Sequence, residues 1–411
     1  MALIVQKYGG TSVGTLDRIR VVADKIIKTR SLGFDLVVVV SAMMGETDRL
    51  VKLAHQMSDL PDPREFDVLL ATGEQVTIAL LTLALLEKGC KACSYTGSQV
   101  RIQTDSAHNK ASIMGIESSK ITADLAAGKV VVVAGFQGID EFGNITTLGR
   151  GGSDTTAVAL AAALKAKECQ IYTDVEGVYT ADPRIVPEAV KLSEITIDEM
   201  LEMAGSGAKV VQIKAVEYAS HHQMPVRVLS TFTEGEGTLI VRENLQKSAI
   251  SGIAFNREEA KFVVQGLEDK PGIAAKIFGP LSLAHIDVDM IVQTRPNKET
   301  IDLAFTIHQR DFKRTEVILK EVLSSLGMGS VTTDEFIAKV CLVGVGIRSH
   351  AGIMSQLFQT LGEEDIHVRL VSTSEIKISV VIAEKELERA VRALHRVFQL
   401  GEVKQEAVVN V

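Results

Sequence analysis

A glycine-rich segment near the amino terminus has the composition of a phosphate-binding loop. It directly follows a short apolar stretch and reads Lys7-Tyr8-Gly9-Gly10-Thr11-Ser12-Val13-Gly14. Glycine lets a backbone approach an anion closely, and the N–H groups at the start of a helix stabilise phosphate oxygens. The ammonium group of Lys7 could reach a phosphoryl group in transfer. The G-x-x-x-x-G-K-[ST] pattern of a Walker A loop is absent, and an ordinary strand-to-helix turn is the alternative interpretation.

A second glycine-rich segment, residues 149–156, opens a predicted helix with the sequence Gly-Arg-Gly-Gly-Ser-Asp-Thr-Thr. Ser153 or Asp154 could simply cap this helix, but a cap requires neither the glycines nor the arginine. Arg150 can bind a carboxylate through two parallel hydrogen bonds. Asp154 can bind an ammonium group or help to hold Mg²⁺. This segment is therefore the most informative local signal of chemistry in the sequence.

Two shorter motifs offer further polar groups. Ser41 and Thr47 lie in a loop that follows a predicted strand, where a loop that caps a helix is the simpler interpretation. Glu74 precedes an apolar helix, in the sequence Thr72-Gly73-Glu74-Gln75. Thr72 and Gln75 could form a capping box there, or Glu74 could bind the ammonium group of a substrate.

Residues 172–184 combine aromatic, acidic and basic side chains in one loop after a predicted strand. A nucleotide needs such a mixture, because its base packs on a flat wall, its ribose needs acceptors and its phosphates need a cation. Lys209 is a second cation beside glycine-rich backbone. The alternative interpretation is a long surface turn, since Asp-Pro, here at residues 182–183, is a common turn start.

The elements that must position these groups alternate between apolar strands and helices in the first part of the chain. Strands are predicted at residues 3–5, 35–40, 129–134, 169–172 and 226–229, and helices at 17–28, 67–87 and 153–165. Continuous apolar strands between helices predict a mainly parallel sheet that is covered on both faces. Such sheets bind ligands at the carboxyl ends of their strands, where the glycine-rich loops fall.

The chain repeats itself after a polar linker at residues 242–249. Gly272, Phe278 and Ile286 match Gly352, Phe358 and Ile366 at a constant offset of 80 residues. Each copy has the predicted order strand, helix, strand, strand, helix, which is close to the ferredoxin-like pattern. A final strand in residues 402–411 could complete either copy.

The bulk composition excludes several classes of protein. The net charge is −8 and no Lys/Arg cluster is present, which argues against nucleic acid as a partner. The start has no signal-peptide pattern, and the longest apolar run, residues 76–86, is shorter than the roughly 20 residues of a membrane span. We therefore expect a soluble, cytoplasmic protein. Cys90 and Cys93 form a lone C-x-x-C without further metal ligands nearby, and we predict no residue as a metal ligand.

Together these motifs resemble the aspartate kinases (aspartokinases) of the amino-acid kinase superfamily, over essentially the whole chain. The repeats resemble paired ACT domains, which bind amino acids and transmit feedback signals. The resemblance implies an α/β fold with a doubly wound, mainly parallel kinase domain at residues 1–245. Two ferredoxin-like βαββαβ ACT units are expected at residues 250–330 and 335–411, and the last strand could complete the first unit.

The resemblance also implies roles for the residues above. Those that face the ATP phosphates are Lys7, Gly9, Gly10 and Ser12. Those that form the aspartate pocket are Ser41, Thr47, Glu74, Arg150, Ser153 and Asp154. Those that bind the rest of the nucleotide are Thr173, Asp174, Tyr179, Asp182, Arg184 and Lys209. Lys7, Arg150 and Asp154 are the expected catalytic residues.

The implied reaction transfers the γ-phosphate of ATP, with Mg²⁺, to the β-carboxylate of L-aspartate and gives β-aspartyl phosphate and ADP. This is the first step of lysine, threonine and methionine biosynthesis. A carboxylate has a reference pKa of about 4 and is already ionised at neutral pH, so no general base is required. Catalysis then depends on alignment and on neutralising the charge of the phosphoryl group.

The resemblance further implies feedback regulation by lysine, threonine or both. The expected effector contacts in the first ACT unit are Asp269, Gly272, Ala274 and Gln293. Residues 365–369 (Asp-Ile-His-Val-Arg) depart from the family's more usual Asn-containing pattern near the effector pocket, so the identity of the effector stays open. ACT units usually pair across a two-fold axis because their edge strands would otherwise be unpaired. We therefore expect a homodimer or a dimer of dimers.

Two other functions are compatible with parts of the pattern. Another kinase of the same fold would act on acetylglutamate, glutamate or a nucleoside monophosphate, and a substrate panel would distinguish it. A non-catalytic amino-acid sensor would retain the kinase fold only as a scaffold. That hypothesis predicts damaged catalytic loops, whereas Lys7, Glu74, Arg150 and Asp154 are all present.

Overall fold

The computed structural model describes residues 1–208, 210–243, 249–347, 350 and 352–402. The chain forms two compact units, which we treat separately. The first unit consists of Met1–Tyr179, Lys191–Gly205 and Lys209–Gln246, and the second of Thr180–Val190, Ser206–Ala208 and Lys247–Val411.

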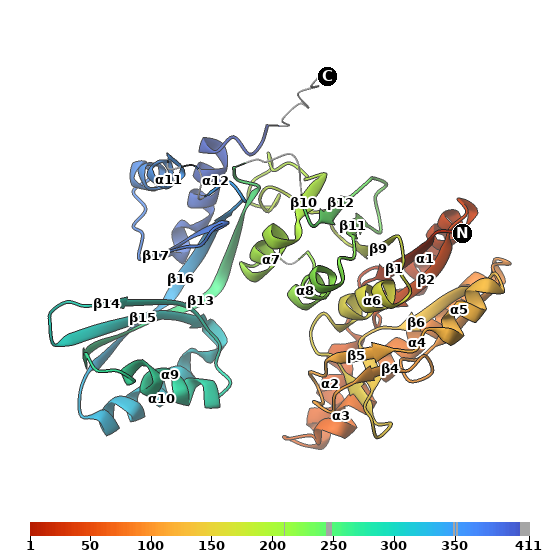
Figure 1. Cartoon of the computed structure of the whole chain (residues 1–411), viewed down its shortest axis with the longest axis horizontal. Coiled ribbons are helices and arrows are strands. Elements are labelled where there is room, and N and C mark those ends of the chain that lie inside the picture. The colour runs from red at the N-terminus through yellow and green to blue at the C-terminus, as the bar shows by residue number, and fades with distance from the viewer. Residues whose placement is uncertain (209, 244–248, 348–349, 351, 403–411) are drawn as a thin grey trace. The chain divides into compact units, whose positions relative to one another are not determined.

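The first unit is built on an eight-stranded sheet (Figure 1). Its strands, in spatial order, are β10 (Glu194–Thr196), β12 (Thr238–Val241), β11 (Val226–Ser230), β9 (Glu168–Thr173), β1 (Leu3–Tyr8), β2 (Asp35–Val40), β6 (Val130–Ala134) and β3 (Ala92–Tyr95). All neighbours from β11 to β3 are parallel, and β12 is antiparallel to β11. The prediction of a mainly parallel sheet is confirmed.

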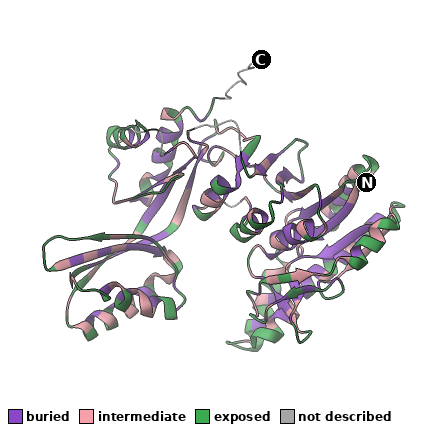
Figure 2. Cartoon of the chain, viewed as in Figure 1, coloured by how far each residue is buried: buried purple, intermediate pink, exposed green. Residues whose placement is uncertain are grey.

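Helices cover both faces of this sheet. The helices α1 (Leu16–Ser31) and α4 (Thr72–Glu87) contribute side chains to the same core cluster as β1, β2 and β6. The helix α6 (Gly152–Ala163) lies against β1, β2 and β9. Alternate side chains of a strand point to opposite faces. Two-sided cover therefore explains why residues 36–40 of β2 and all of β6 are apolar and buried (Figure 2). The remaining helices are α2 (Glu46–Met57), α3 (Pro63–Leu70), α5 (Ser119–Ala126), α7 (Ile197–Gly205) and α8 (Ile213–His222).

The predicted helix at residues 67–87 is instead two helices, α3 and α4, which meet at Ala71. Together, Pro63–Glu87 is the one stretch in the described part of the chain that is long and apolar enough to cross a membrane, by length and composition only. The α4 residues Ile78, Leu81 and Leu85 are buried in the core against the central sheet. Packing against the sheet therefore accounts for these apolar residues, whereas Val76, Leu83 and Leu86 of the same helix are exposed.

A small four-stranded sheet was not predicted. Its strands, in spatial order, are β5 (Ile113–Ile116), β4 (Ile102–Thr104), β7 (Gln137–Ile139) and β8 (Ile145–Thr147). Each strand has only three or four residues. Strands this short give no alternating pattern long enough to distinguish from loop sequence.

The second unit contains a single six-stranded sheet shared by both repeats. Its strands, in spatial order, are β14 (Val288–Thr294), β15 (Thr300–His308), β13 (Gly252–Glu268), β16 (Ser330–Val343), β18 (Lys377–Ala383) and β17 (Leu370–Thr373). The helices α9 (Ile273–Leu283) and α10 (Phe312–Leu326) pack on the first repeat, and α11 (Gly352–Glu363) and α12 (Leu387–Val397) on the second. The predicted order strand, helix, strand, strand, helix is confirmed for both repeats.

The two central strands, β13 and β16, are much longer than the strands that the sequence predicts at residues 262–266 and 340–344, because each serves both repeats. The first part of β13, Gly252–Asn256, pairs with Lys339–Val343 of the second repeat, and the last part pairs with residues 330–334 of β16. Each repeat thus receives its fourth strand from an extension of the other. The strand predicted in residues 402–411 lies, apart from its first residue, outside the described residues.

Residues 180–190 belong to the second unit, although they precede the linker by more than fifty positions in sequence number. Ala181, Ile185 and Val186 are buried in the same core cluster as the second repeat. The side chain of Thr180 is hydrogen-bonded to that of His395 at 3.0 Å. This segment therefore forms part of the core of the second repeat, and the domain boundaries stay a prediction.

Candidate active site

The carboxyl ends of four parallel strands lie side by side in the central sheet. Tyr8 at the end of β1 pairs with Val40 of β2 and with Tyr172 of β9, and Val40 pairs with Ala134 of β6. The segments beginning at Gly9, Ser41, Gly135 and Thr173 therefore emerge from one edge of the sheet. The predicted loops after β1, β2 and β9 therefore lie at the same edge, because the register of the strands brings their carboxyl ends together.

Lys7 and Asp154 form an ion pair at this edge. The Lys7 Nζ lies 2.6 Å from the Asp154 Oδ1, and the two side chains are 11% and 10% exposed. Asp154 is not a helix cap, because α6 is capped by Gly151 with no side-chain hydrogen bond. The capping alternative is therefore wrong for both Ser153 and Asp154. What remains is an acidic side chain that holds the lysine ammonium group at the end of β1.

The first glycine loop leaves room for Lys7. A Cβ atom on Gly9 would lie 3.3 Å from the Lys7 Nζ, and one on Gly10 would lie 3.0 Å from the carbonyl oxygen of Ala42. Ser12 is fully buried, and its hydroxyl is 2.6 Å from the Thr231 hydroxyl. The loop thus carries a cation and closely packed backbone, as phosphate binding requires.

Glu74 is a buried carboxylate in the first turn of α4. The Oε1 accepts a hydrogen bond from the Ala42 N–H at 2.9 Å, whereas the buried Oε2 has no partner among the described residues. Burial raises the pKa of Glu74 from 4.5 to about 7. The predicted capping box is wrong, because the Thr72 hydroxyl donates to the Leu69 carbonyl oxygen instead. A carboxylate with a free oxygen is suited to receive a cationic group.

The second glycine loop turns sharply before α6. Gly151 has a φ of 71°, and a Cβ atom there would lie 2.2 Å from the Gln212 Cγ. Arg150 is exposed, and Ser153 is buried against Gly135 so closely that a Cβ atom on that glycine would lie 2.7 Å from the Ser153 Oγ. Arg150 is therefore available for a ligand, whereas Ser153 packs into the base of the loop.

Ser41 and Thr47 are half-buried on either side of a turn. Ser41 follows β2 directly, and its N–H donates to the Tyr8 carbonyl oxygen at 3.1 Å. Thr47 lies in the first turn of α2, whose cap is Gly45 without a side-chain hydrogen bond. Neither hydroxyl caps α2, and their assignment to the aspartate pocket stays a prediction.

The residues predicted to bind the nucleotide are distributed over both units. In the first unit, the Thr173 hydroxyl donates to the Asp174 Oδ1 at 3.0 Å and the Tyr179 hydroxyl donates to Glu176 at 3.1 Å. In the second unit, Asp182 and Arg184 form an ion pair at 2.7 Å, and hydrogen bonding to the guanidinium lowers the Asp182 pKa. Lys209 lies outside the described residues.

Gly135 and Thr231 were not predicted as site residues. Gly135 packs against Ser153 of the second glycine loop, and Thr231 bonds to Ser12 of the first. Gly135 directly follows β6 at the same edge of the sheet, where a glycine is as informative as in the other loops. Thr231 carried no such signal, because its bond to Ser12 joins residues that are far apart in the chain.

The predicted effector residues surround one end of the first repeat. Asp269 forms an ion pair with Arg295, which follows β14 by one residue, and its N–H donates to the Glu299 carbonyl oxygen at 2.9 Å. Gly272 caps α9 with a φ of 88°, Ala274 lies in the first turn of that helix, and Gln293 is exposed on β14. Their role in effector binding stays a prediction.

Family models match almost the whole chain. The model of the amino acid kinase family matches residues 2–230, and two models described as ACT domains match residues 262–326 and 340–398. An aspartokinase of Pseudomonas aeruginosa is 60% identical over 404 residues, which cover 97% of this chain and 98% of the relative.

Solved structures agree with these matches. Escherichia coli aspartokinase III in complex with aspartate and ADP is 26% identical, with a TM-score of 0.81, and the match covers 96% of this chain and 99% of that one. The same enzyme in complex with lysine and aspartate gives a TM-score of 0.75, again at 26% identity over 96% and 99% of the two chains. The chain therefore belongs to the aspartate kinases of the amino acid kinase family, with two C-terminal ACT domains.

Proposed function

We propose that this protein transfers the γ-phosphate of ATP to the β-carboxylate of L-aspartate at the edge of the central sheet described above. The observation that carries this proposal is the nearly buried Lys7–Asp154 ion pair, at the point where the first glycine loop leaves β1 and the second enters α6. A cation held in this way can neutralise the charge of a phosphoryl group without first having to be ordered.

The proposed substrate contacts follow from the charges at the site. Arg150 is exposed and can grip a carboxylate of aspartate, and Ser41, Thr47 and Ser153 supply hydroxyl groups nearby in the predicted pocket. The unpartnered oxygen of Glu74 can accept the aspartate ammonium group. The aspartate-bound E. coli relative supports this choice of substrate.

The proposed nucleotide contacts are Gly9, Gly10 and Ser12 at the phosphates, and Thr173, Asp174, Tyr179, Asp182, Arg184 and Lys209 at the remainder of ATP. Backbone N–H groups of the loop and the Lys7 ammonium group orient the transferred phosphate toward the acceptor. Because the acceptor is ionised, no residue has to remove a proton, and the rate enhancement depends on alignment and on neutralising the charge of the phosphoryl group.

Mg²⁺ is proposed as the metal that accompanies ATP. Among the described residues, no group of three or more His, Cys, Asp and Glu side chains could hold a metal ion. This suits Mg²⁺, which usually keeps several waters and binds through one or two carboxylates together with substrate phosphates. Asp154 and Asp174 are the carboxylates at this edge that fit such a role, and the bound ion would neutralise charge on the phosphates.

We further propose that lysine, threonine or both inhibit the enzyme by binding to the first ACT domain near Asp269, Gly272, Ala274 and Gln293. The lysine-bound E. coli relative supports an amino-acid effector. The proposed enzyme is cytoplasmic and catalyses the first step of lysine, threonine and methionine biosynthesis. It assembles as a homodimer or a dimer of dimers through its ACT domains.

The first test is ATP turnover with L-aspartate in the presence of hydroxylamine, which traps an acyl phosphate as the hydroxamate. Aspartyl hydroxamate formation that falls on addition of lysine or threonine is the expected result. Trapping without inhibition would reject these effectors and keep the kinase. Turnover with acetylglutamate, glutamate or a nucleoside monophosphate, and none with aspartate, would overturn the proposed substrate.

A further inference from the structure

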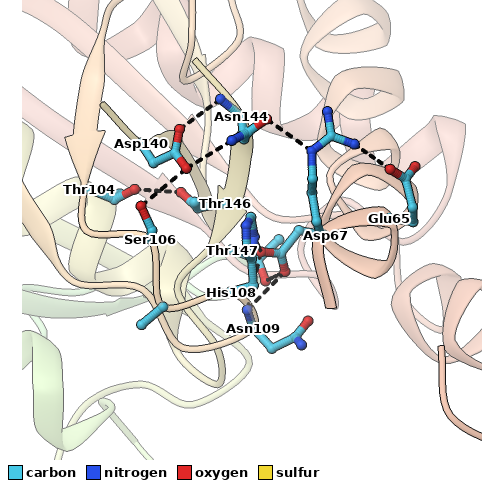
Figure 3. A network of polar contacts seen from close by, with 12 residues as sticks. Glu65, Asp67, Thr104, Ser106, His108, Asn109, Asp140, Asn144, Thr146 and Thr147 are labelled. Atoms are coloured by element: carbon cyan, nitrogen blue, oxygen red, sulfur yellow. Dashed lines mark hydrogen bonds and ion pairs between the residues drawn. The ribbon is translucent and has the colours of Figure 1, made fainter. Parts of the chain in front are cut away.

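A buried polar network lies between α3 and the small four-stranded sheet, outside the residues assigned to either substrate (Figure 3). At its centre is Asp67 of α3, which is fully buried. Its Oδ2 lies 2.7 Å from the His108 Nδ1, and its Oδ1 accepts a hydrogen bond from the Thr147 hydroxyl at 2.5 Å. The Asn109 N–H donates to both carboxylate oxygens, at 3.0 and 3.1 Å.

The Asp67 carboxylate bonds to two segments that lie next to Arg150 in the structure: the end of β8, through Thr147, and the loop that contains Asn109. Thr147 ends β8, three residues before Arg150, and its carbonyl oxygen accepts the Ala111 N–H at 2.9 Å. Between them, Gly149 has a φ of 74°, and a Cβ atom there would lie 3.0 Å from the Asn109 carbonyl oxygen. The turn into the second glycine loop is thus packed against a segment that Asp67 holds.

The helix that carries Asp67 continues directly into the start of α4. The Ala71 N–H at the junction of α3 and α4 donates to the Asp67 carbonyl oxygen at 3.0 Å. The Ala71 carbonyl oxygen accepts a hydrogen bond from the Gln137 side chain of β7 at 2.9 Å. Glu74 lies in the first turn after this junction. The Asp67 carboxylate therefore bonds to the strand that leads to Arg150, and its helix leads directly into the helix that carries Glu74.

We propose that Asp67 is a positioning residue for the amino-acid substrate: it sets the spacing between the carboxylate-binding Arg150 and the ammonium-binding Glu74. This inference rests on the proposed function of those two residues. A buried carboxylate that accepts several hydrogen bonds restrains its partners strongly, because each would otherwise lose a buried bond. Small misplacements of binding groups have large effects on affinity and rate.

Neighbouring threonines of β8 supply a matched pair of variants. Both hydroxyls are buried; Thr147 bonds to Asp67, whereas Thr146 bonds to Thr104 of β4 in the same small sheet at 2.6 Å. Replacing each by valine removes one buried hydroxyl and keeps the shape. We expect Thr147→Val to raise the KM for aspartate about tenfold and to leave the KM for ATP within about twofold. Thr146→Val should leave both KM values within about twofold, at a similar loss of melting temperature.

Asp67→Asn provides a second measurement, because an amide keeps the shape but loses the charge and an acceptor. We expect a rise in the KM for aspartate, together with faster hydrogen exchange in residues 105–112 and no change in the KM for ATP. A parallel Asp140→Asn variant alters a carboxylate that organises the β7–β8 turn through Asn144 and Phe142. Asp140 also accepts a hydrogen bond from the Ser106 hydroxyl at 3.2 Å, so the variant is a control for the KM for aspartate and not for hydrogen exchange in residues 105–112. That variant should not change the KM for aspartate.

Equal effects of the Thr146 and Thr147 variants on the KM for aspartate, or a matching rise in the KM for ATP, would overturn the inference and leave only a structural role. Arg150→Ala separates this inference from the proposed function. If Arg150→Ala leaves the KM for aspartate unchanged, the substrate assignment itself fails. If it raises that KM and Thr147→Val does not, only the role of Asp67 is wrong.

Discussion

The Lys7 ammonium group and the Asp154 carboxylate are 2.6 Å apart, with about one-tenth of each side chain exposed. The pair joins the end of the first strand to the first turn of α6. Such a pair stabilises the fold only if its geometry is good, because both charges have lost much of their hydration. Its position beside the first glycine loop is what suggests a role in phosphoryl transfer.

We predict that Lys7→Ala lowers kcat by orders of magnitude while aspartate still binds, because the variant removes the cation expected to neutralise the transferring phosphate. Hydroxamate formation measures the first quantity and calorimetry the second. The variant should also lose about 3 kcal/mol of unfolding free energy in urea, because Asp154 is left unpaired. Near-normal turnover would remove Lys7 from the mechanism.

Lys28→Ala is the matched control for this substitution. Lys28 pairs with Glu234 at 3.1 Å, but the two side chains are 66% and 79% exposed. Exposed pairs contribute little to stability. Turnover and unfolding free energy should both stay close to those of the unaltered protein.

Glu74 should make aspartate binding depend on pH near neutrality. Its pKa of about 7 means that the carboxylate is progressively protonated below that pH. A neutral carboxyl group attracts an ammonium group only weakly, so the KM for aspartate should rise by up to about tenfold for each pH unit below 7. Glu74→Gln should show a high KM without this pH dependence. A KM for the unaltered protein that is constant from pH 6 to 8 would contradict the assignment.

The same carboxylate should lower the stability of the ligand-free protein at alkaline pH. Since the folded-state pKa is raised above 4.5, the folded protein binds the proton more tightly than the unfolded chain between pH 4.5 and about 7. Stability therefore falls as pH rises through this window. Glu74→Gln should be more stable than the unaltered protein at pH 8, by up to about 3 kcal/mol, and nearly equal to it at pH 4.5. Urea unfolding at the two pH values tests the difference.

Gly151→Ala should destabilise the protein by more than the cost of placing alanine at a positive φ. The added Cβ would clash with Gln212, whereas a Cβ atom added to Gly143, which has a φ of 83°, would meet no other atom within 4 Å. Gly143→Ala should therefore cost only about 1 kcal/mol from its backbone conformation. Gly151→Ala should cost more and raise the KM for aspartate, and Gln212→Gly should partly reverse both effects. Equal melting temperatures for the two alanine variants would reject the clash.

The second unit should lose stability in mild acid through His395. This side chain bonds to Thr180, and burial lowers its pKa from 6.5. Below about pH 6.5 the unfolded chain takes up a proton that the folded unit resists, so stability falls as pH falls, by at most about 1.4 kcal/mol per pH unit. Hydrogen exchange of residues 387–402 in the full chain should report this loss.

His395→Gln should remove that part of the pH dependence. His285→Asn is the control, because His285 is exposed and has a φ of 55°, which asparagine tolerates. The control should keep the pH dependence of exchange. A pH dependence that persists in His395→Gln would assign it to another group.

The sequence by itself determined the framework of this protein. The apolar runs at residues 35–40 and 129–134 predicted buried parallel strands, and the 80-residue offset predicted a duplicated small domain. These signals are strong because long apolar runs and periodic helices reflect burial directly. The glycine, lysine and arginine residues of the loops also indicated phosphate and carboxylate binding, with ordinary turns as the alternative.

Only the tertiary structure decided which of these groups meet. Lys7 and Asp154 form an ion pair between separate elements, and Asp67 has three hydrogen-bonding partners outside its own helix. The buried, unpartnered oxygen of Glu74 likewise results from the packing of α4 against other elements. The short strands β4 and β8 and the placement of residues 180–190 in the second unit also left no local trace. Local sequence determines which elements form, but the distances between their side chains depend on strand register and helix packing, which arise only when the whole chain folds.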